Sequence, residues 1–225
     1  MTSRDDDMAA RRAAMVREIE RNAGDLKPRF ALSPRVLAAM GEVPRHAFVP
    51  PEHLGEAYRN RPLPIGFGQT ISQPFIVALM TELAALKPGD RVLDVGTGSG
   101  YQATILARLV SHVFTIELCA PLAARAAHTF KTLGVHNVTM RVGDGHQGWP
   151  EEAPFDAIVA AAAPHDVPEA LVAQLKPGGR LVIPVGERSQ KLIVVEKASD
   201  QSLHRTEIIP VSFVPLVKED DDGSP

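Results

Sequence analysis

A glycine-rich run near the middle of the chain has the residue types and spacing of a ligand-binding loop. Gly96, Gly98 and Gly100 alternate with Thr97 and a serine, and Asp94 stands two places before the first glycine. Glycines let the backbone turn sharply and let a ligand approach it, and a helix that begins after them presents free N–H groups to an anion such as a carboxylate. Dinucleotide-binding loops are spaced G-x-G-x-x-G, whereas this run is spaced G-x-G-x-G. It therefore predicts a small-molecule site of another kind, unless the glycines only cap a helix.

The run resembles motif I of the class I S-adenosylmethionine-dependent methyltransferases. In that family an acidic residue at the end of the second strand binds the ribose and another after the third strand binds the adenine, and Glu117 and Asp144 stand at these places. A carboxylate can accept hydrogen bonds from ribose hydroxyls or from an amino group, although both acids could also be solvated loop residues. The resemblance implies S-adenosyl-L-methionine as methyl donor, S-adenosyl-L-homocysteine as product and no metal. The implied cofactor-binding residues are Thr70, Ile71, Ser72, Asp94, Gly96, Thr97, Gly98, Gly100, Glu117, Leu118, Asp144 and Gly145.

Further motifs narrow the resemblance to one family. The chain is similar to the protein-L-isoaspartate O-methyltransferases in the glycine run and at Val43–Arg45, Pro64–Pro74, Gly143–Gly145, Pro154–Ile158 and Phe213–Val217. The resemblance runs roughly from Leu32 to Lys218, and Asp94-Val95 stands where bacterial relatives often have Glu-Ile. It implies methyl transfer to the free carboxylate of L-isoaspartyl residues in damaged peptides and proteins. It also implies Ser72 as the catalytic residue and Thr70 and Ser72 as substrate-binding residues.

The polar side chains of the run Pro64–Pro74 suit a carboxylate acceptor. A free α-carboxyl group has a pKa of about 3.3 to 3.7, so it is ionised near neutrality and needs no general base. The run accordingly carries the hydroxyls of Thr70 and Ser72 and two glutamine amides, but no obvious base. A hydroxyl can hold one carboxylate oxygen and direct the other towards the methyl group, so proximity and orientation should supply most of the rate. Ser72 has a second possible role, because it precedes a predicted helix and could be its N-cap.

Alternating strands and helices must bring these residues together. Apolar runs predict strands at 91–95, 113–117, 138–142, 157–161 and 180–184, with helices at 74–86, 101–110, 121–133 and 168–175. This alternation favours a parallel sheet with helices on both faces. Two further strands, at 192–196 and 207–213, follow without an intervening helix and predict an antiparallel end. The expected fold is α/β, a doubly wound Rossmann-like arrangement with a seven-stranded mixed sheet that is mostly parallel and has an antiparallel strand near the C-terminus.

Length and composition bound the domain organisation. A chain of 225 residues with a hydrophobic fraction of 44% fits one soluble domain. We expect a helical N-terminal extension over 1–31, with a surface helix at 8–22, a methyltransferase domain over 32–218 and a disordered acidic tail over 219–225. A net charge of −3 offers no field to hold a nucleic-acid backbone. The single cysteine, with no secretory signal and no apolar stretch of about 20 residues, predicts a cytoplasmic protein that does not bind membranes. We also expect a monomer, although no sequence feature specifies the oligomeric state.

Other interpretations stay open at this stage. A methyltransferase acting on a small molecule or RNA would keep the cofactor loop and change the acceptor. A nicotinamide-dependent oxidoreductase would accommodate Glu117, although the glycine spacing argues against it. A non-catalytic cofactor-binding protein would need Ser72 only as a cap. His165 is expected to be an exposed loop residue rather than a base, and Cys119 is expected to fill the core.

Overall fold

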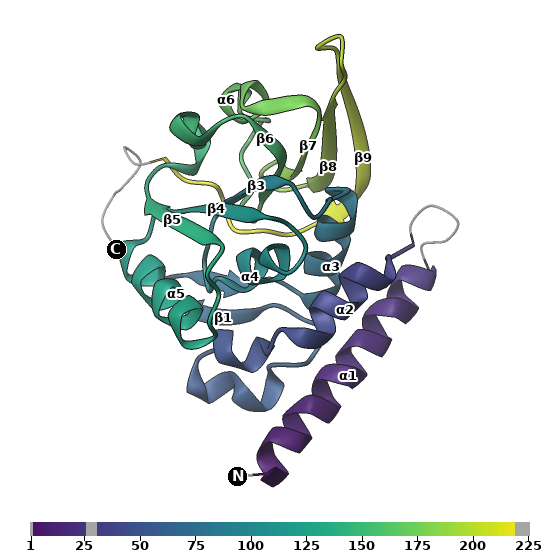
Figure 1. Ribbon diagram of the computed structural model, residues 1–225, viewed down its shortest axis with the longest axis vertical. Helices are drawn as coiled ribbons and strands as arrows, with labels where there is room; N and C mark the ends of the chain where they lie inside the picture. The colour runs from purple at the N-terminus through teal and green to yellow at the C-terminus, as the bar shows by residue number, and fades with distance from the viewer. Residues whose placement is uncertain (1, 26–30, 219–225) are drawn as a thin grey trace.

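The main sheet of the computed structural model, which describes residues 2–25 and 31–218, has seven strands in the order β5-β4-β3-β6-β7-β8-β9 (Figure 1). The strands are β3 (Arg91–Val95), β4 (His112–Glu117), β5 (Val138–Val142), β6 (Phe155–Ala160), β7 (Leu175–Val185), β8 (Gln190–Lys197) and β9 (Leu203–Val211). Pairing from β5 through β7 is parallel, and β8 is antiparallel to both its neighbours. The predicted mixed sheet with an antiparallel strand near the C-terminus is confirmed.

Side chains that alternate along the strands build a separate hydrophobic core on each face of the sheet. In β3, Val92 joins one core while Leu93 and Val95 join the other, and in β6, Val159 and Ile158 divide in the same way. This is the period of two that a strand imposes. Because both faces are covered, the central strands β3 and β6 are buried almost throughout, as in other buried parallel sheets, whereas the edge strands β5 and β9 are partly exposed.

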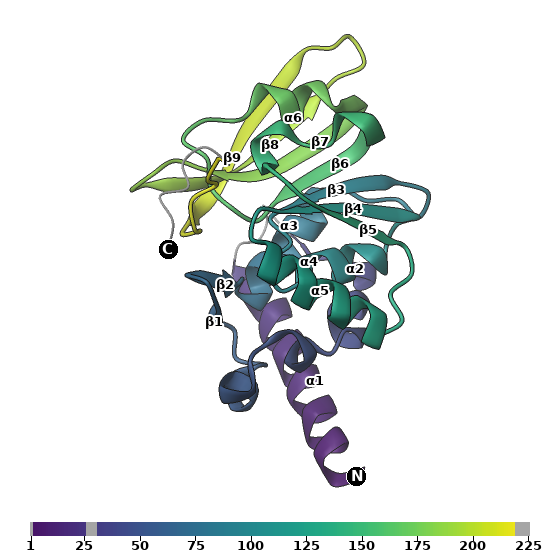
Figure 2. The ribbon, with the colours of Figure 1, turned by 90° about the vertical axis from the view of Figure 1, so that its left-hand side faces the viewer.

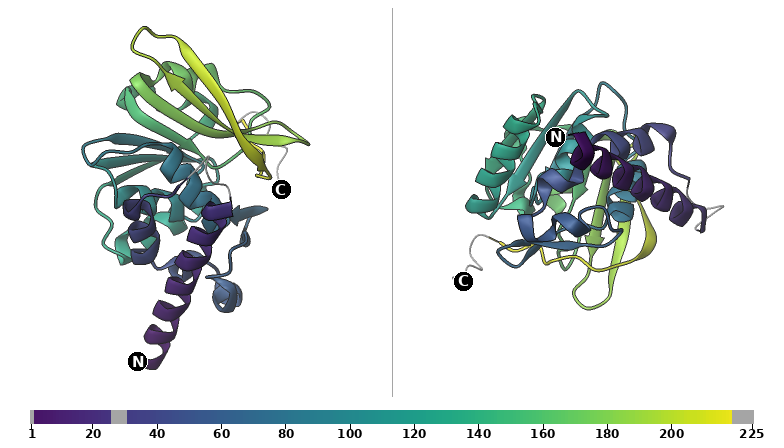
Figure 3. Two further views of the ribbon diagram at one scale, coloured as in Figure 1. Left: turned by 90° about the vertical axis from the view of Figure 1, so that its right-hand side faces the viewer. Right: turned by 90° about the horizontal axis from the view of Figure 1, so that it is seen from below.

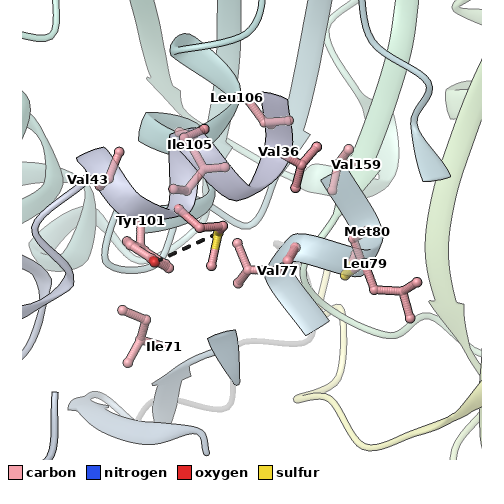
Figure 4. Packing of buried hydrophobic residues seen from close by; sticks show 14 of the residues in the cluster. Val36, Val43, Ile71, Val77, Leu79, Met80, Tyr101, Ile105, Leu106 and Val159 are labelled. Atoms are coloured by element: carbon pink, nitrogen blue, oxygen red, sulfur yellow. Dashed lines mark hydrogen bonds between the residues drawn. The ribbon is translucent and has the colours of Figure 1, made fainter. Parts of the chain in front are cut away.

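Helices cover the two faces unequally. The helices are α2 (Pro34–Glu42), α3 (Pro74–Leu83), α4 (Tyr101–Ala107), α5 (Ala120–Thr132) and α6 (Glu169–Ala173). Figure 2 shows α2 to α5 below the strands β3 to β5, whereas α6 lies on the other side. Figure 4 shows how the first of these cores joins α2, α3 and α4, with Val36, Val77 and Ile105 directed towards one another. The sequence prediction extended the last helix to Leu175, but that residue is already the first of β7.

The N-terminal helix α1 (Thr2–Asp25) is longer than the predicted helix and is only partly a surface element. Its first turns project from the body (Figure 3), whereas Met15, Ile19 and Ala23 are buried in the same core as α2 and α3. The second half of α1 is thus packed as part of the main core. Residues 26–30 and the predicted acidic tail 219–225 lie outside the described residues.

A short hairpin that the sequence analysis did not predict precedes α3. Its strands are β1 (Leu63–Gly66) and β2 (Gln69–Ile71), and they pair outside the main sheet. Two 3₁₀ segments, η1 (Arg45–Phe48) and η2 (Pro51–Glu56), connect α2 to this hairpin. Arg125 of α5 fixes the hairpin to the body, because its Nη1 donates to the carbonyl oxygen of Ile65 at 2.7 Å.

Arg45 joins this connecting segment to the start of α4. Its side chain is completely buried, its Nε donates to the carbonyl oxygen of Ala57 at 2.9 Å, and its guanidinium lies 4.9 Å from the centre of the Tyr101 ring. Burial lowers the pKa of Arg45 to about 10, although the contact with Tyr101 favours the charged form. Tyr101 directly follows the glycine run, so the contact with Arg45 helps to fix the end of this loop.

Candidate functional site

A cavity of about 670 Å³ opens where β3, β4 and β6 end. The chain leaves β3 towards β4 and later returns to the other side of β3 as β6, which makes this the switch point of the sheet. Ligands of open α/β sheets bind at such points, and the volume suits a small molecule. Most of the lining comes from four groups of residues: 69–72 in and just after β2, 96–99 of the glycine run, 116–121 at and beyond the end of β4, and 214–217 near the C-terminus.

Most of the residues predicted from the sequence lie together on this cavity. Nine of them line it: Thr70, Ile71, Ser72, Gly96, Thr97, Gly98, Glu117, Leu118 and Gly145. Asp94, Gly100 and Asp144 do not line it, and each of them holds a lining residue in place instead. The structure therefore supports one site with an inner set of contacts and a supporting layer.

The glycine run is a turn anchored on β4. The backbone N–H groups of Gly96 and Thr97 both donate to the carbonyl oxygen of Ile116, at 2.9 and 3.0 Å. Gly100, with φ of +86°, is the position at which only glycine fits, because a Cβ atom there would lie 2.7 Å from the Phe130 ring. Helix α4 begins immediately afterwards, so its first N–H groups are directed at the cavity end of the turn.

Glu117 ties the glycine run to the end of β4. Its Oε2 accepts a hydrogen bond from the N–H of Gly98 at 2.7 Å, and its Oε1 accepts one from the N–H of Cys119 at 2.9 Å. The side chain is largely buried yet lines the cavity. Each carboxylate oxygen has two lone pairs, so both oxygens can still accept from a molecule in the cavity.

Asp94 lies beneath the glycine run and reaches the cavity only through two threonines. It is completely buried, and its Oδ2 accepts from the hydroxyl of Thr115 at 2.7 Å. The Thr115 and Thr97 hydroxyl oxygens are 2.6 Å apart, and Thr97 lines the cavity. Burial raises the pKa of Asp94 to about 7; the Thr115 hydrogen bond opposes this shift and the charge of Glu117 adds to it. A direct contact with a bound molecule is therefore not expected for Asp94.

Asp144 organises the turn that carries Gly145. Its Oδ1 accepts from the backbone N–H of His146 at 2.8 Å and lies 3.1 Å from the Nδ1 of the same residue, which caps the 3₁₀ segment η3 (Gly145–Gln147). A Cβ atom on Gly145 would lie 2.6 Å from the Val95 side chain and 3.1 Å from that of Leu216. A larger residue than Gly145 would therefore clash with these two side chains at this wall of the cavity.

Ser72 is not the N-cap of α3, so that interpretation of the residue is wrong. Gln73 occupies the cap position and makes no side-chain hydrogen bond to the helix. The backbone N–H of Phe75 instead donates to Oδ1 of Asn60 at 3.0 Å. Among the described residues, none forms a hydrogen bond with the Ser72 hydroxyl, which lines the cavity beside Thr70. Both hydroxyls are therefore available to a molecule bound there.

A C-terminal segment, Phe213–Val217, closes one side of the cavity and was not predicted as part of the site. The side-chain amide of Gln190 accepts from the N–H of Phe213 at 2.6 Å and donates to the carbonyl oxygen of the same residue at 3.0 Å. The N–H of Ala163 donates to Val214, and the carbonyl oxygen of Ala163 accepts from Leu216, both at 2.8 Å. The sequence signal was present, because this segment is one of the motifs that carry the family resemblance.

Two reactive side chains complete the site description. His165 is exposed and paired with Asp166 at 2.6 Å, away from the cavity, and this carboxylate raises the pKa of the His165 imidazole. Cys119, which was expected to fill the core, packs against it and also lies on the cavity wall at the N-cap of α5. Within residues 2–25 and 31–218, no group of three or more His, Cys, Asp or Glu side chains could hold a metal ion. No described helix is long and apolar enough to cross a membrane.

Comparison with known sequences identifies close relatives. Residues 16–221 match the family model described as protein-L-isoaspartate(D-aspartate) O-methyltransferase. The chain is 54% identical over 222 residues to protein-L-isoaspartate O-methyltransferase 1 of Cupriavidus necator, covering 96% of this chain and 86% of the relative. It is 55% identical over 205 residues to protein-L-isoaspartate O-methyltransferase 2 of a Polaromonas species, covering 90% and 95%.

Comparison with solved structures agrees. One structure of a protein-L-isoaspartate O-methyltransferase is similar with a TM-score of 0.81 and 28% identity over 91% of this chain, and the match spans 65% of that longer chain. A second, of a candidate protein-L-isoaspartate O-methyltransferase from Plasmodium falciparum in complex with S-adenosyl-L-homocysteine, has a TM-score of 0.78 and 26% identity, covering 92% of this chain and 98% of the other. The fold and the class of cofactor therefore agree with the motifs.

Proposed function

The chain belongs to the family of protein-L-isoaspartate O-methyltransferases, and we infer that the cavity at the ends of β3, β4 and β6 is where it transfers a methyl group from S-adenosylmethionine to the free carboxylate of L-isoaspartyl residues. The observation that supports this assignment is that motifs from distant parts of the sequence meet in one cavity. The glycine run, Glu117, the hydroxyls of Thr70 and Ser72, and the segment Phe213–Val217 are far apart in the sequence yet share this one cavity.

The lining suits the two ends of the methyl donor. The N–H groups at the start of α4 can bind its carboxylate, and the free lone pairs of Glu117 can accept from its ribose hydroxyls. Leu118 and Gly145 also line the cavity, and we assign the base of the donor to this part of it. When bound, the donor supplies an electrophilic methyl group on a sulfonium ion. We assign Asp94 and Asp144 supporting roles, through Thr97 and Gly145 respectively.

The acceptor side needs orientation rather than proton transfer. An isoaspartyl residue presents an ionised α-carboxylate, and Ser72 and Thr70 can each donate a hydrogen bond to it. Holding one oxygen in this way directs the other at the methyl group, which is the main source of rate in such a displacement. The buried Ile71 and the partly buried Leu216 exclude water from this end, so the opposite charges of carboxylate and sulfonium attract each other more strongly.

A pair of peptides tests the function directly. With labelled S-adenosylmethionine, the protein is expected to methylate a peptide that contains L-isoaspartate and to leave the same peptide with normal aspartate essentially unlabelled. The reason is that only the isoaspartyl linkage presents a free α-carboxylate within the chain. Equal labelling of both peptides would contradict the substrate assignment while leaving methyl transfer intact. A reaction without peptide controls for self-methylation.

Gln190 is expected to act as a positioning residue for the acceptor peptide. Gln190→Ala removes both hydrogen bonds to Phe213, each worth about 1 kcal/mol, and should raise the KM for the isoaspartyl peptide about 5- to 30-fold with little change in kcat. Gln190→Glu keeps the acceptor for the Phe213 N–H and should give a smaller increase. Steady-state kinetics with the peptide as varied substrate measure this split. A fall in kcat at unchanged KM would show that Gln190 has another role.

Further properties are proposed on the sequence alone. We infer a catalytic domain over 32–218, with an extension over 1–31 whose second half packs into the core of this domain, and a tail over 219–225. The net charge of −3 and the single cysteine support a cytoplasmic enzyme that takes protein substrates rather than nucleic acid or membranes, and we propose that it is a monomer. Sedimentation at micromolar concentration tests the monomer, because a dimer would double the mass.

A further inference from the structure

The tip of the β1–β2 hairpin exposes an aromatic side chain in an unfavourable backbone conformation. Phe67 has φ of +54° and lies between Gly66 at +91° and Gly68 at +69°. Left-handed backbone is uncommon for a bulky residue and costs free energy. The Phe67 side chain is also 58% exposed, so burial does not offset this cost. Asparagine or glycine would satisfy the turn better, which indicates that phenylalanine at this position serves function.

The position of Phe67 at the cavity indicates a role in binding the substrate. It lines the cavity, on the same hairpin that presents Thr70 and Ser72. Val217, from the C-terminal segment, also lines the cavity and is 43% exposed. Among the described residues, four large hydrophobic side chains are exposed, and the other two, Val142 and Leu203, lie elsewhere. Exposed apolar groups thus gather at the mouth of this cavity.

The hairpin presents Phe67 on a fixed base. Leu63, Ile65 and Ile71 are buried, and Arg125 bonds to the carbonyl oxygen of Ile65. The tip itself is open, because a Cβ atom on Gly68 would meet nothing within 4 Å. Figure 2 shows the hairpin standing out from the body of the molecule. A chain that enters the cavity from this side would pass along the exposed ring.

We propose that Phe67 is a specificity-determining residue that packs against the side chain of the residue next to the isoaspartyl residue, with Val217 as a second exposed apolar contact. This rests on the proposed function, since the occupant is the acceptor peptide itself. An apolar neighbour would cover the exposed ring and be favoured over a small polar one. The enzyme therefore reads the sequence around the damaged site in addition to the isoaspartyl linkage.

Two isoaspartyl peptides that differ only in the adjacent residue, leucine or serine, test the proposal. The wild-type kcat/KM should be about 5- to 20-fold higher for the leucine peptide, and Phe67→Asn should bring this ratio close to one. Asparagine tolerates left-handed backbone, so the hairpin should stay intact and the melting temperature should not fall. Leu203→Asn, at an equally exposed position on β9, is the control and should keep the wild-type ratio.

The outcomes separate this proposal from the proposed function. An unchanged ratio in Phe67→Asn, or no preference in the wild type, would overturn the role of Phe67 while methylation of both peptides upheld the activity. Absence of methylation of either peptide by the wild type would overturn both. The adjacent residue is varied first on the N-terminal and then on the C-terminal side, so a preference on either side is detected.

Discussion

Replacement of Glu117 by alanine is expected to weaken S-adenosylmethionine binding about 100-fold or more. A hydrogen bond to a charged acceptor is worth about 1.5 to 3 kcal/mol, and the variant loses the acceptor that we propose for two ribose hydroxyls. It also loses the bonds from the N–H groups of Gly98 and Cys119, so the glycine run is no longer fixed to β4. Isothermal titration calorimetry on the folded variant measures the change in Kd.

Two further variants divide this effect into its parts. Glu117→Gln keeps the side-chain length and one oxygen acceptor, but its NH₂ group cannot accept from a backbone N–H, so we expect an intermediate Kd. Glu169→Ala, at an exposed position at the start of α6, is a control for the loss of a negative charge and should bind normally. A Kd for Glu117→Ala within about threefold of the wild type would show that Glu117 does not contact the ribose.

The sheet could be predicted because each of its central strands is marked by a short run of neighbouring apolar residues in the sequence. The predicted bounds of 91–95 and 138–142 are those of β3 and β5 in the structure. A buried parallel strand is a short apolar run between turn residues, and such runs are separated here by helical patterns of the expected length. The predicted strands also place the glycine run and the acidic residues at strand ends near one another, because the carboxyl ends of parallel strands meet at one edge of the sheet.

The parts that could not be predicted depend on contacts between distant residues. Asn60 caps α3 from 15 positions upstream, and Gln190 holds Phe213 across 23 positions. The β1–β2 hairpin has strands of only four and three residues and three consecutive positive φ angles at its turn, and strands this short are not recognisable from alternation alone. Burial of Asp94 likewise depends on Thr115 of the neighbouring strand. The secondary-structure propensities of neighbouring residues do not indicate any of these long-range contacts.

Substitution of Ser72 separates a catalytic hydroxyl from a structural one. Ser72→Ala is expected to lower kcat about 10- to 100-fold, the effect of losing one hydrogen bond of about 1.4 to 2.8 kcal/mol in the transition state. The melting temperature should stay close to that of the wild type, because Asn60 and not Ser72 caps α3. Ser72→Gly should lose turnover to the same extent, whereas Ser72→Thr keeps the hydroxyl and should lose activity only through crowding by its methyl group.

Asn60→Ala is the reciprocal control. It removes the acceptor for the Phe75 N–H and should cost about 1 kcal/mol of stability, as the loss of a helix cap does, while leaving the hydroxyls at the cavity in place. Turnover at saturating donor, measured well below every melting point, then compares the two positions. Loss of activity with full stability in Ser72→Ala, and loss of stability with most activity retained in Asn60→Ala, is the expected pattern. Full activity in Ser72→Ala would move the carboxylate contact to the neighbouring hydroxyl of Thr70, which lines the same wall of the cavity.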